Sequence, residues 1–257
     1  MTLTESGFAP VERGQLRYDK TGEGPAVVLL HGFAIDRRSW EDQIAPFAVD
    51  HMVIAYDLRG FGESTMPDGP YRPHDDLAAL LDHLGITQAS LVGSSMGARV
   101  AFDFAIAYPE RTRVVVSADG VPSGWVFNRL PGARRGPDRA QVARTLASLT
   151  PDRQLWFRAI AGDYSRWHHS NEDPRVELAP PAIERLDEVM APTLLLVGDD
   201  DGETYHKAAD MLTMGVAHSR KSIVVNSGHL PNLEAPFEFN RQVLEFLNLN
   251  RRYALSR

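Results

Sequence analysis

A short segment in the first half of the chain has the residue types of a serine nucleophile. The pentapeptide at 93–97 reads Gly-Ser-Ser-Met-Gly, with a strand-like run before it and a helix-like run over 98–108. A serine hydroxyl is a weak nucleophile at neutral pH. A sharp strand-to-helix turn exposes such a serine at the end of a sheet and points the N-terminus of the next helix at it. The spacing of the motif selects Ser95 as the nucleophile.

The elements that must position Ser95 alternate along the chain. Apolar, β-rich runs predict strands, and the segments between them have helical spacing, which predicts a mostly parallel sheet covered by helices on both faces. The predicted strands occupy 8–13, 15–21, 26–30, 52–56, 89–92, 113–117, 193–197 and 222–225. The predicted helices of the core include 73–84, 98–108, 205–214 and 237–247.

The alternation stops in the middle of the chain. From 120 to about 185 the sequence is rich in Pro, Gly and Arg, with helix-like patches at 140–149 and 153–161. An interruption between two strands of one sheet is typical of an insertion. We therefore expect a core formed by 1–120 and 186–257, and an inserted helical lid at 121–185.

Composition excludes several classes of protein. The 257 residues contain no cysteine, which excludes disulfides, thiolate metal sites and cysteine nucleophiles. The net charge of −7 disfavours nucleic acid as a partner. No apolar run approaches the roughly 18 residues of a membrane-spanning helix, and the first residues lack a signal-peptide pattern. We expect a cytoplasmic protein without a membrane partner; the sequence does not determine its oligomeric state.

Four motifs, in their order along the chain, resemble those of the α/β-hydrolase family. The resemblance runs from 8 to about 249 and is weakest in the predicted lid. It implies an α/β-hydrolase fold with a mostly parallel, eight-stranded sheet. The motifs are His-Gly-Phe at 31–33, Asp-Leu-Arg-Gly-Phe-Gly-Glu-Ser at 57–64, the pentapeptide at 93–97, and the pair formed by Gly-Asp-Asp-Asp at 198–201 and Gly-His at 228–229.

The resemblance implies a role for each polar residue of a catalytic triad. Ser95 attacks a carbonyl carbon, and His229 takes the proton of Ser95 and later passes it to the leaving group. An aspartate holds the imidazole in the correct tautomer. Its usual place in the family corresponds to Asp201, although the residue after Asp201 is Gly202 where proline is common. Asp119 occupies the place that some relatives use instead.

The resemblance also implies an oxyanion hole and a substrate pocket. The backbone N–H groups of Phe33 and Met96 are expected to bind the negative oxygen of the tetrahedral intermediate. This chemistry needs no metal and no organic cofactor. His31, Asp57 and Arg59 are expected to shape loops rather than react, the last two as a pair. The expected pocket residues are Gly32, Trp125, Phe127, Trp156 and Leu230.

The predicted lid carries an unusual local charge. Between 120 and 166 there are eight arginines and three aspartates, so this stretch carries +5 and the rest of the chain carries −12. One interpretation is a solvated surface in a chain that uses arginine freely. The other is a positive field over the pocket mouth that steers an anionic, carboxylate-bearing substrate.

These residues predict a cofactor-independent serine hydrolase that acts on a small carboxylic ester or lactone. Similar proteins leave three alternatives. One is carbon–carbon bond cleavage in a ring-fission diketone, although those relatives often have asparagine where this chain has Ser94. Another is a perhydrolase or haloperoxidase-like activity. The third is a non-catalytic ligand receptor on the same fold. Epoxide and haloalkane hydrolysis are disfavoured, because those relatives use an aspartate where this chain has Ser95.

Overall fold

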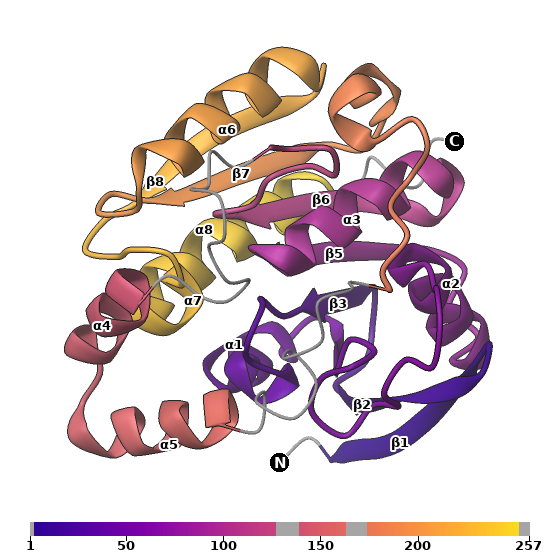
Figure 1. The fold of residues 1–257 in the computed structure, drawn as a ribbon, viewed down its shortest axis with the longest axis horizontal. Coiled ribbons are helices and arrows are strands. Elements are labelled where there is room, and N and C mark those ends of the chain that lie inside the picture. The colour runs from indigo at the N-terminus through magenta and orange to yellow at the C-terminus, as the bar shows by residue number, and fades with distance from the viewer. Residues whose placement is uncertain (1–2, 127–138, 163–173, 252–257) are drawn as a thin grey trace.

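One mixed sheet organises the protein (Figure 1). The computed structural model describes residues 3–126, 139–162 and 174–251. In these residues the sheet has eight strands in the order β1-β2-β4-β3-β5-β6-β7-β8. The strands are β1 (Thr4–Val11), β2 (Gly14–Thr21), β3 (Ala26–Leu30), β4 (Met52–Tyr56), β5 (Ala89–Ser94), β6 (Thr112–Ala118), β7 (Thr193–Gly198) and β8 (Ser219–Val224).

The sheet is antiparallel only at one edge. β1 and β2 form a hairpin, β2 also pairs antiparallel with β4, and the strands from β4 to β8 are parallel. β3, β5 and β7 are buried along their whole length. They are rich in Ala, Val and Leu, without alternation of polar and apolar residues, because helices cover both faces of a parallel sheet. The eight-stranded, mostly parallel sheet expected from the sequence is therefore confirmed.

Helices cover the two faces of the sheet and create two apolar clusters. One cluster joins the sheet to α2, α3 and α6, and the other joins it to α1 and α8. The helices of the core are α1 (Glu41–Phe47), α2 (Pro73–His83), α3 (Met96–Ala107), α6 (Glu203–Gly215), α7 (Pro231–Glu234) and α8 (Pro236–Leu249). Short 3₁₀ turns are η1 (Arg37–Trp40), η2 (Pro109–Arg111), η4 (Ala182–Glu184) and η5 (Leu186–Glu188).

Two further helices, α4 (Arg139–Ser148) and α5 (Pro151–Gly162), lie between β6 and β7 in the chain. Figure 1 shows them next to α7 and α1, outside the layered core. The Thr145 hydroxyl of α4 donates to the Glu234 carboxylate of α7 over 2.7 Å. Arg153 of α5 forms ion pairs with Glu41 and Asp42 of α1 at 3.0 and 2.5 Å. The division into a core and a lid at 121–185 stays a prediction.

The parallel strands bring four polar residues to the edge of the sheet that is formed by the carboxyl ends of these strands. Because parallel strands all end at this edge, the residues that follow them become neighbours there even when they are far apart in sequence. Ser95 follows β5, Asp119 follows β6, Asp201 lies shortly after β7, and His229 follows β8. The order of the strands thus explains why these residues meet.

Candidate active site

Ser95 lies in the tight turn between β5 and α3. Its backbone has φ 50° and ψ −108°, a left-handed conformation that is uncommon for a residue with a side chain. The Ser95 N–H donates to the Ala118 carbonyl over 2.8 Å, which ties the turn to the end of β6. α3 begins at Met96, so its first backbone N–H groups lie beside the Ser95 side chain. The sharp strand-to-helix turn that the pentapeptide predicted is therefore present, and the role of Ser95 as the nucleophile stays a prediction.

The second glycine of the pentapeptide allows α3 to pack against the backbone of β3. A Cβ on Gly97 would lie 2.1 Å from the Leu30 carbonyl oxygen. The obstacle is the backbone of a buried strand, which cannot rotate away as a side chain can. The turn therefore depends on a position without a side chain.

We expect Gly97→Ala to lower the free energy of unfolding by about 3 kcal/mol, because the added methyl forces the strand and α3 apart. Urea denaturation of both proteins measures the change. Gly202→Ala is the matched control: Gly202 has φ −63° and a Cβ there would meet nothing within 4 Å. It should change the stability by less than about 1 kcal/mol. Equal losses in the two variants would contradict the packing argument.

Ser95, His229 and Asp201 form a hydrogen-bonded chain. The His229 Nε2 atom lies 3.0 Å from the Ser95 Oγ, and the Nδ1 atom lies 2.9 Å from the Asp201 Oδ2. The Asp201 Oδ1 accepts the Gly202 N–H over 2.7 Å. With Nδ1 donating to a carboxylate, Nε2 is left as the acceptor for the serine proton. The arrangement can therefore activate Ser95.

The acid that reaches His229 is Asp201 rather than Asp119. Its side chain is fully buried, whereas 13% of the His229 side chain is exposed. Burial raises the pKa of Asp201, but the hydrogen bond and the charge of His229 outweigh it, so the net pKa lies below its ordinary value. Asp201 is thus held as a carboxylate.

Glu234 holds the loop that carries His229, and sequence reasoning missed it. The Glu234 carboxylate accepts the N–H groups of Gly228 and Leu230 over 2.6 and 3.2 Å, on either side of the histidine. It also accepts the Thr145 hydroxyl. The available signal was an acidic side chain in the short helix that directly follows the histidine.

The loop after β3 lies beside Ser95. A Cβ on Gly32 would be 3.6 Å from the Ser95 Cβ, so the two backbones are neighbours. His31 is fully buried at the start of this loop. Its Nε2 accepts the Leu58 N–H over 3.0 Å, so its Nδ1 must carry the proton that goes to the Gly32 carbonyl at 2.7 Å. His31 therefore joins two loops as a neutral imidazole, in the structural role expected for it.

The buried His31 predicts a loss of stability in acid. Burial lowers its pKa to about 4, below the ordinary 6.5, although the hydrogen bond to Gly32 opposes this. The folded state then binds fewer protons than the unfolded state between these values, so stability falls as the pH drops from 6.5 to 4. The His31 contribution is about 3 kcal/mol. In urea denaturation across this range, His31→Gln should reduce the slope, whereas His206→Gln should keep it. An unchanged slope in His31→Gln would refute the assignment.

Asp57 and Arg59 shape loops, but they do so with separate partners. Asp57 accepts the Arg37 guanidinium at 2.6 Å and the Glu63 N–H at 2.9 Å. Arg59 forms a buried, bidentate salt bridge with Asp76, with N–O distances of 2.9 and 2.6 Å. The expectation that the two form one pair is wrong, because Asp57 is paired with Arg37 and Arg59 is paired with Asp76.

Comparison with known proteins places this architecture. A model of the alpha/beta hydrolase family matches residues 27–242. This chain belongs to the α/β-hydrolase family.

Relatives of this α/β hydrolase have several activities by name. A 3-oxoadipate enol-lactonase 2 from Acinetobacter baylyi is 30% identical, over 89% of this chain and 91% of the relative. A 2-hydroxy-6-oxononadienedioate/2-hydroxy-6-oxononatrienedioate hydrolase 2 from Pseudomonas putida is 29% identical, over 95% and 96%. The solved structure of an N-acyl homoserine lactone degrading enzyme superposes with a TM-score of 0.78. Its sequence is 25% identical, over 93% of this chain and all of that one.

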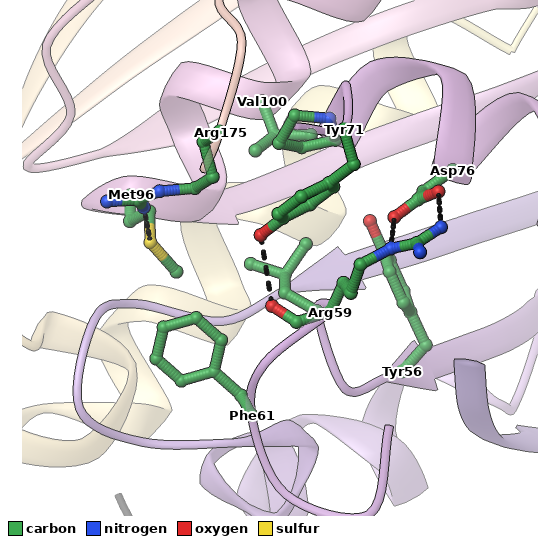
Figure 2. A pocket seen from close by; sticks show the side chains of 10 residues that line it. Tyr56, Arg59, Phe61, Tyr71, Asp76, Met96, Val100 and Arg175 are labelled. Carbon is green, nitrogen blue, oxygen red and sulfur yellow. Dashed lines mark hydrogen bonds and ion pairs between the residues drawn. The ribbon is translucent and has the colours of Figure 1, made fainter. Parts of the chain in front are cut away.

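A small pocket of this α/β hydrolase lies beside Met96 (Figure 2). Figure 2 shows Met96 and Arg175 at one end of the pocket, the Arg59–Asp76 pair at the other, and Tyr71 between them. Of the residues expected at the site, Met96 lines this pocket. Gly32, Trp125, Trp156 and Leu230 are not among its lining residues and stay predictions, and Phe127 lies outside the described residues.

Arg175 is a pocket residue that sequence reasoning missed. Its guanidinium lies 5.9 Å from the centre of the Phe33 ring and contacts the Met96 sulfur. The backbone on either side is fixed: the Tyr71 N–H donates to Pro174 over 3.0 Å, and Val176 donates back to Tyr71 over 2.8 Å. A cation is thus held against two residues that were expected at the oxyanion hole.

The arginine-rich stretch itself is only partly described. Arg153 lies over the Trp156 ring at 4.0 Å and is paired with two acids of α1, so it binds α5 to the core. Arg129, Arg134, Arg135 and Arg166 lie outside the described residues. Within the described ranges, no helix is long and apolar enough to span a membrane, and no three acidic or histidine side chains gather as a metal site.

Proposed function

We propose that this α/β hydrolase is a cofactor-independent serine hydrolase that cleaves a small carboxylic ester or lactone through an acyl-enzyme on Ser95. The observation that carries the proposal is the hydrogen-bonded order of Ser95, His229 and Asp201, at 3.0 and 2.9 Å. A nucleophile, a base and a buried acid hydrogen-bonded in this order are an arrangement that activates serine for acyl transfer.

The proposed reaction has two steps. Ser95 Oγ attacks the carbonyl carbon while His229 Nε2 takes its proton, and the N–H groups of Phe33 and Met96 stabilise the oxyanion. His229 then protonates the leaving alcohol, and the acyl-enzyme forms. In the second step His229 takes a proton from water, the resulting hydroxide attacks the acyl carbon, and Ser95 regains its proton as the acid leaves.

The substrate class is supported by names and by charge. The enol-lactonase among the relatives is named for a lactone, and its identity of 30% extends over most of both chains. Arg175 adds a cation beside Met96, which favours a substrate with a carboxylate away from the reacting carbonyl. We also propose that residues 121–185 form a helical lid on the core and that the protein is cytoplasmic.

Covalent labelling tests the nucleophile before any substrate is known. Wild type, Ser95→Ala and His229→Ala are treated with a fluorophosphonate and weighed intact. One adduct on wild type, mapped to Ser95 and lost in both variants, supports the proposal. Folded wild type without an adduct would reject it and favour a ligand receptor. The rates of hydrolysis of a panel of esters and lactones, together with an assay for peracid formation, then assign the reaction.

Carbon–carbon bond cleavage is the second candidate. The observation that favours it is the hydrolase from Pseudomonas putida, 29% identical over 95% of this chain, which is named for unsaturated oxo-dioic acids. Against it stands Ser94, where such relatives often carry asparagine. Loss of absorbance of a ring-fission diketone at a rate above that of every ester and lactone would select this candidate.

Arg175 predicts a preference for anionic substrates. Arg175→Gln should lower kcat/KM about tenfold for a carboxylate-bearing ester and leave a neutral ester of the same size nearly unchanged, because one charge-assisted hydrogen bond is lost. The ratio of the two substrates is the measurement. Arg158→Gln, which removes an exposed arginine of α5, is the control and should not change this ratio. An equal loss on both esters would count against the charge argument.

A further inference from the structure

Asp119 is a buried carboxylic acid next to the candidate active site that the proposed reaction does not use. It directly follows β6 and is 1% exposed, with φ 48°. Its N–H donates to the Leu196 carbonyl of β7 over 2.9 Å, and the preceding residue, Ala118, accepts the Ser95 N–H over 2.8 Å. The backbone at Asp119 is therefore tied to β7 on one side and to the nucleophile turn on the other.

The two carboxyl oxygens of Asp119 have different surroundings. Oδ1 accepts the Gly198 N–H over 3.1 Å. Oδ2 is buried and receives a hydrogen bond from no N–H or O–H group of the described residues. Asp201 is its neighbour, because Gly198, whose N–H donates to Asp119 Oδ1, also accepts the Asp201 N–H over 3.2 Å at its carbonyl. The Asp119 side chain is within hydrogen-bonding reach of the Asp201 carboxylate. Two carboxyl groups in contact in a dry site must share a proton, because both cannot be ionised together.

The surroundings decide which of the two carboxyls keeps the proton. Asp201 accepts the His229 imidazole and the Gly202 N–H, which favour its charged form. Asp119 has the single Gly198 N–H. Two charged groups act on Asp119, and both are acidic: Asp201, from the loop after β7, and Glu234 of α7. The imidazole of His229 is hydrogen-bonded to Asp201. Burial, and then the charge of Asp201, raise the pKa of Asp119 well above its ordinary value.

We propose that Asp119 is a positioning residue that stays protonated and donates its O–H to Asp201, holding that carboxylate against His229. The proposal rests on the proposed function of Ser95, His229 and Asp201. The proton does not leave Asp119 during the reaction, because Asp119 serves only as a hydrogen-bond donor. Asp119 is therefore the neutral neighbour of the acid that orients His229, in the place that the sequence offered as an alternative acid.

The protonation state can be measured without any substrate. In protein with ¹³C-labelled aspartate side chains, the signal that disappears in Asp119→Asn belongs to Asp119. At pH 7 it should have the chemical shift of a protonated carboxyl and should not titrate between pH 5 and 8. A signal that has already ionised at pH 7 would overturn the proposal, whether or not the protein hydrolyses esters.

Kinetics test the positioning role. In Asp119→Asn the Gly198 N–H holds the amide oxygen, so the amide N–H₂ faces Asp201 and replaces the lost O–H donor. We expect kcat/KM within threefold of wild type and an acid limb at the same pH. Asp119→Leu has the same branching and the same number of side-chain heavy atoms but has no donor, and kcat/KM should fall at least tenfold. Urea denaturation of both variants shows whether they are folded under the conditions in which kcat/KM is measured.

Each other outcome contradicts the proposal in a distinct way. If Asp119 were ionised, Asp119→Asn would remove a negative charge near the imidazolium form of His229, and the acid limb would move to lower pH by about one unit. If Asp119→Leu folds and has wild-type activity, the donor does not position Asp201. If fluorophosphonates do not label the wild-type protein, the proposed function fails. The ¹³C signal of the Asp119 carboxyl still decides whether Asp119 is protonated.

Discussion

We expect Ser95→Ala to lower kcat by about 10⁶-fold, because the residual rate comes only from substrate binding and the oxyanion donors. The substitution removes one oxygen, the atom that lies 3.0 Å from His229 Nε2. Alanine keeps the Cβ at φ 50°, so the turn pays no new conformational cost. The measurement is turnover of the best ester or lactone from the panel, together with urea denaturation to show that the variant folds as wild type does.

Ser94→Ala is the matched control for this substitution. Ser94 is the neighbouring serine, 1% exposed, and its Oγ has no hydrogen-bond partner among the described residues. Its removal should leave kcat within about threefold, since surface or core changes away from the reacting atoms act mainly on stability. A large loss in Ser94→Ala with a small loss in Ser95→Ala would show that the wrong serine has been assigned.

We expect Asp201→Asn to lower kcat by about 10⁴-fold, because the wrong tautomer of His229 becomes the stable one. The Gly202 N–H, 2.7 Å from Oδ1, would hold the amide oxygen of the new side chain. The amide N–H₂ then occupies the place of Oδ2 and donates to His229 Nδ1, so that Nε2 carries the proton. A protonated Nε2 cannot accept the proton of Ser95.

Asp119→Asn is the control for Asp201→Asn. Both variants replace a buried aspartate at the same edge of the sheet with its isosteric amide, and only Asp201 contacts His229. The ratio of their kcat values should therefore exceed 10³, about the difference between a 10⁴-fold and a threefold loss. Similar losses in the two variants would mean that the two acids share the role, and a larger loss in Asp119→Asn would reverse the assignment.

Much of the fold could be predicted because its signals are local. The predicted strands at 26–30 and 52–56 coincide with β3 and β4, and the helix predicted over 73–84 corresponds to α2 (Pro73–His83). Continuous apolar runs, helical spacing and an opening proline act over a few neighbouring residues. The same holds for the turn at Ser95, where the two glycines and the flanking elements lie within one short stretch.

The pocket could not be predicted because it is assembled from distant segments. Its wall combines residues around Tyr71, the start of α3 at Met96 and the backbone near Arg175. Nothing in the local sequence of Arg175 says that it pairs with Tyr71, about a hundred residues earlier. The sequence instead suggested aromatic residues such as Trp125 and Trp156, whose side chains are typical of a pocket wall. The local sequence pattern does not determine where such side chains lie in the fold.

By itself the sequence determined the family, the nucleophile turn and a histidine and two aspartates that could serve Ser95. Only the tertiary structure decided between the two acids, and it gave each a different surrounding. β6 and β7 are neighbours in the sheet, so Asp119 and Asp201 both reach the same edge. Whether Asp119 or Asp201 contacts His229 depends on side-chain positions and burial, and those arise only when the strands are packed together.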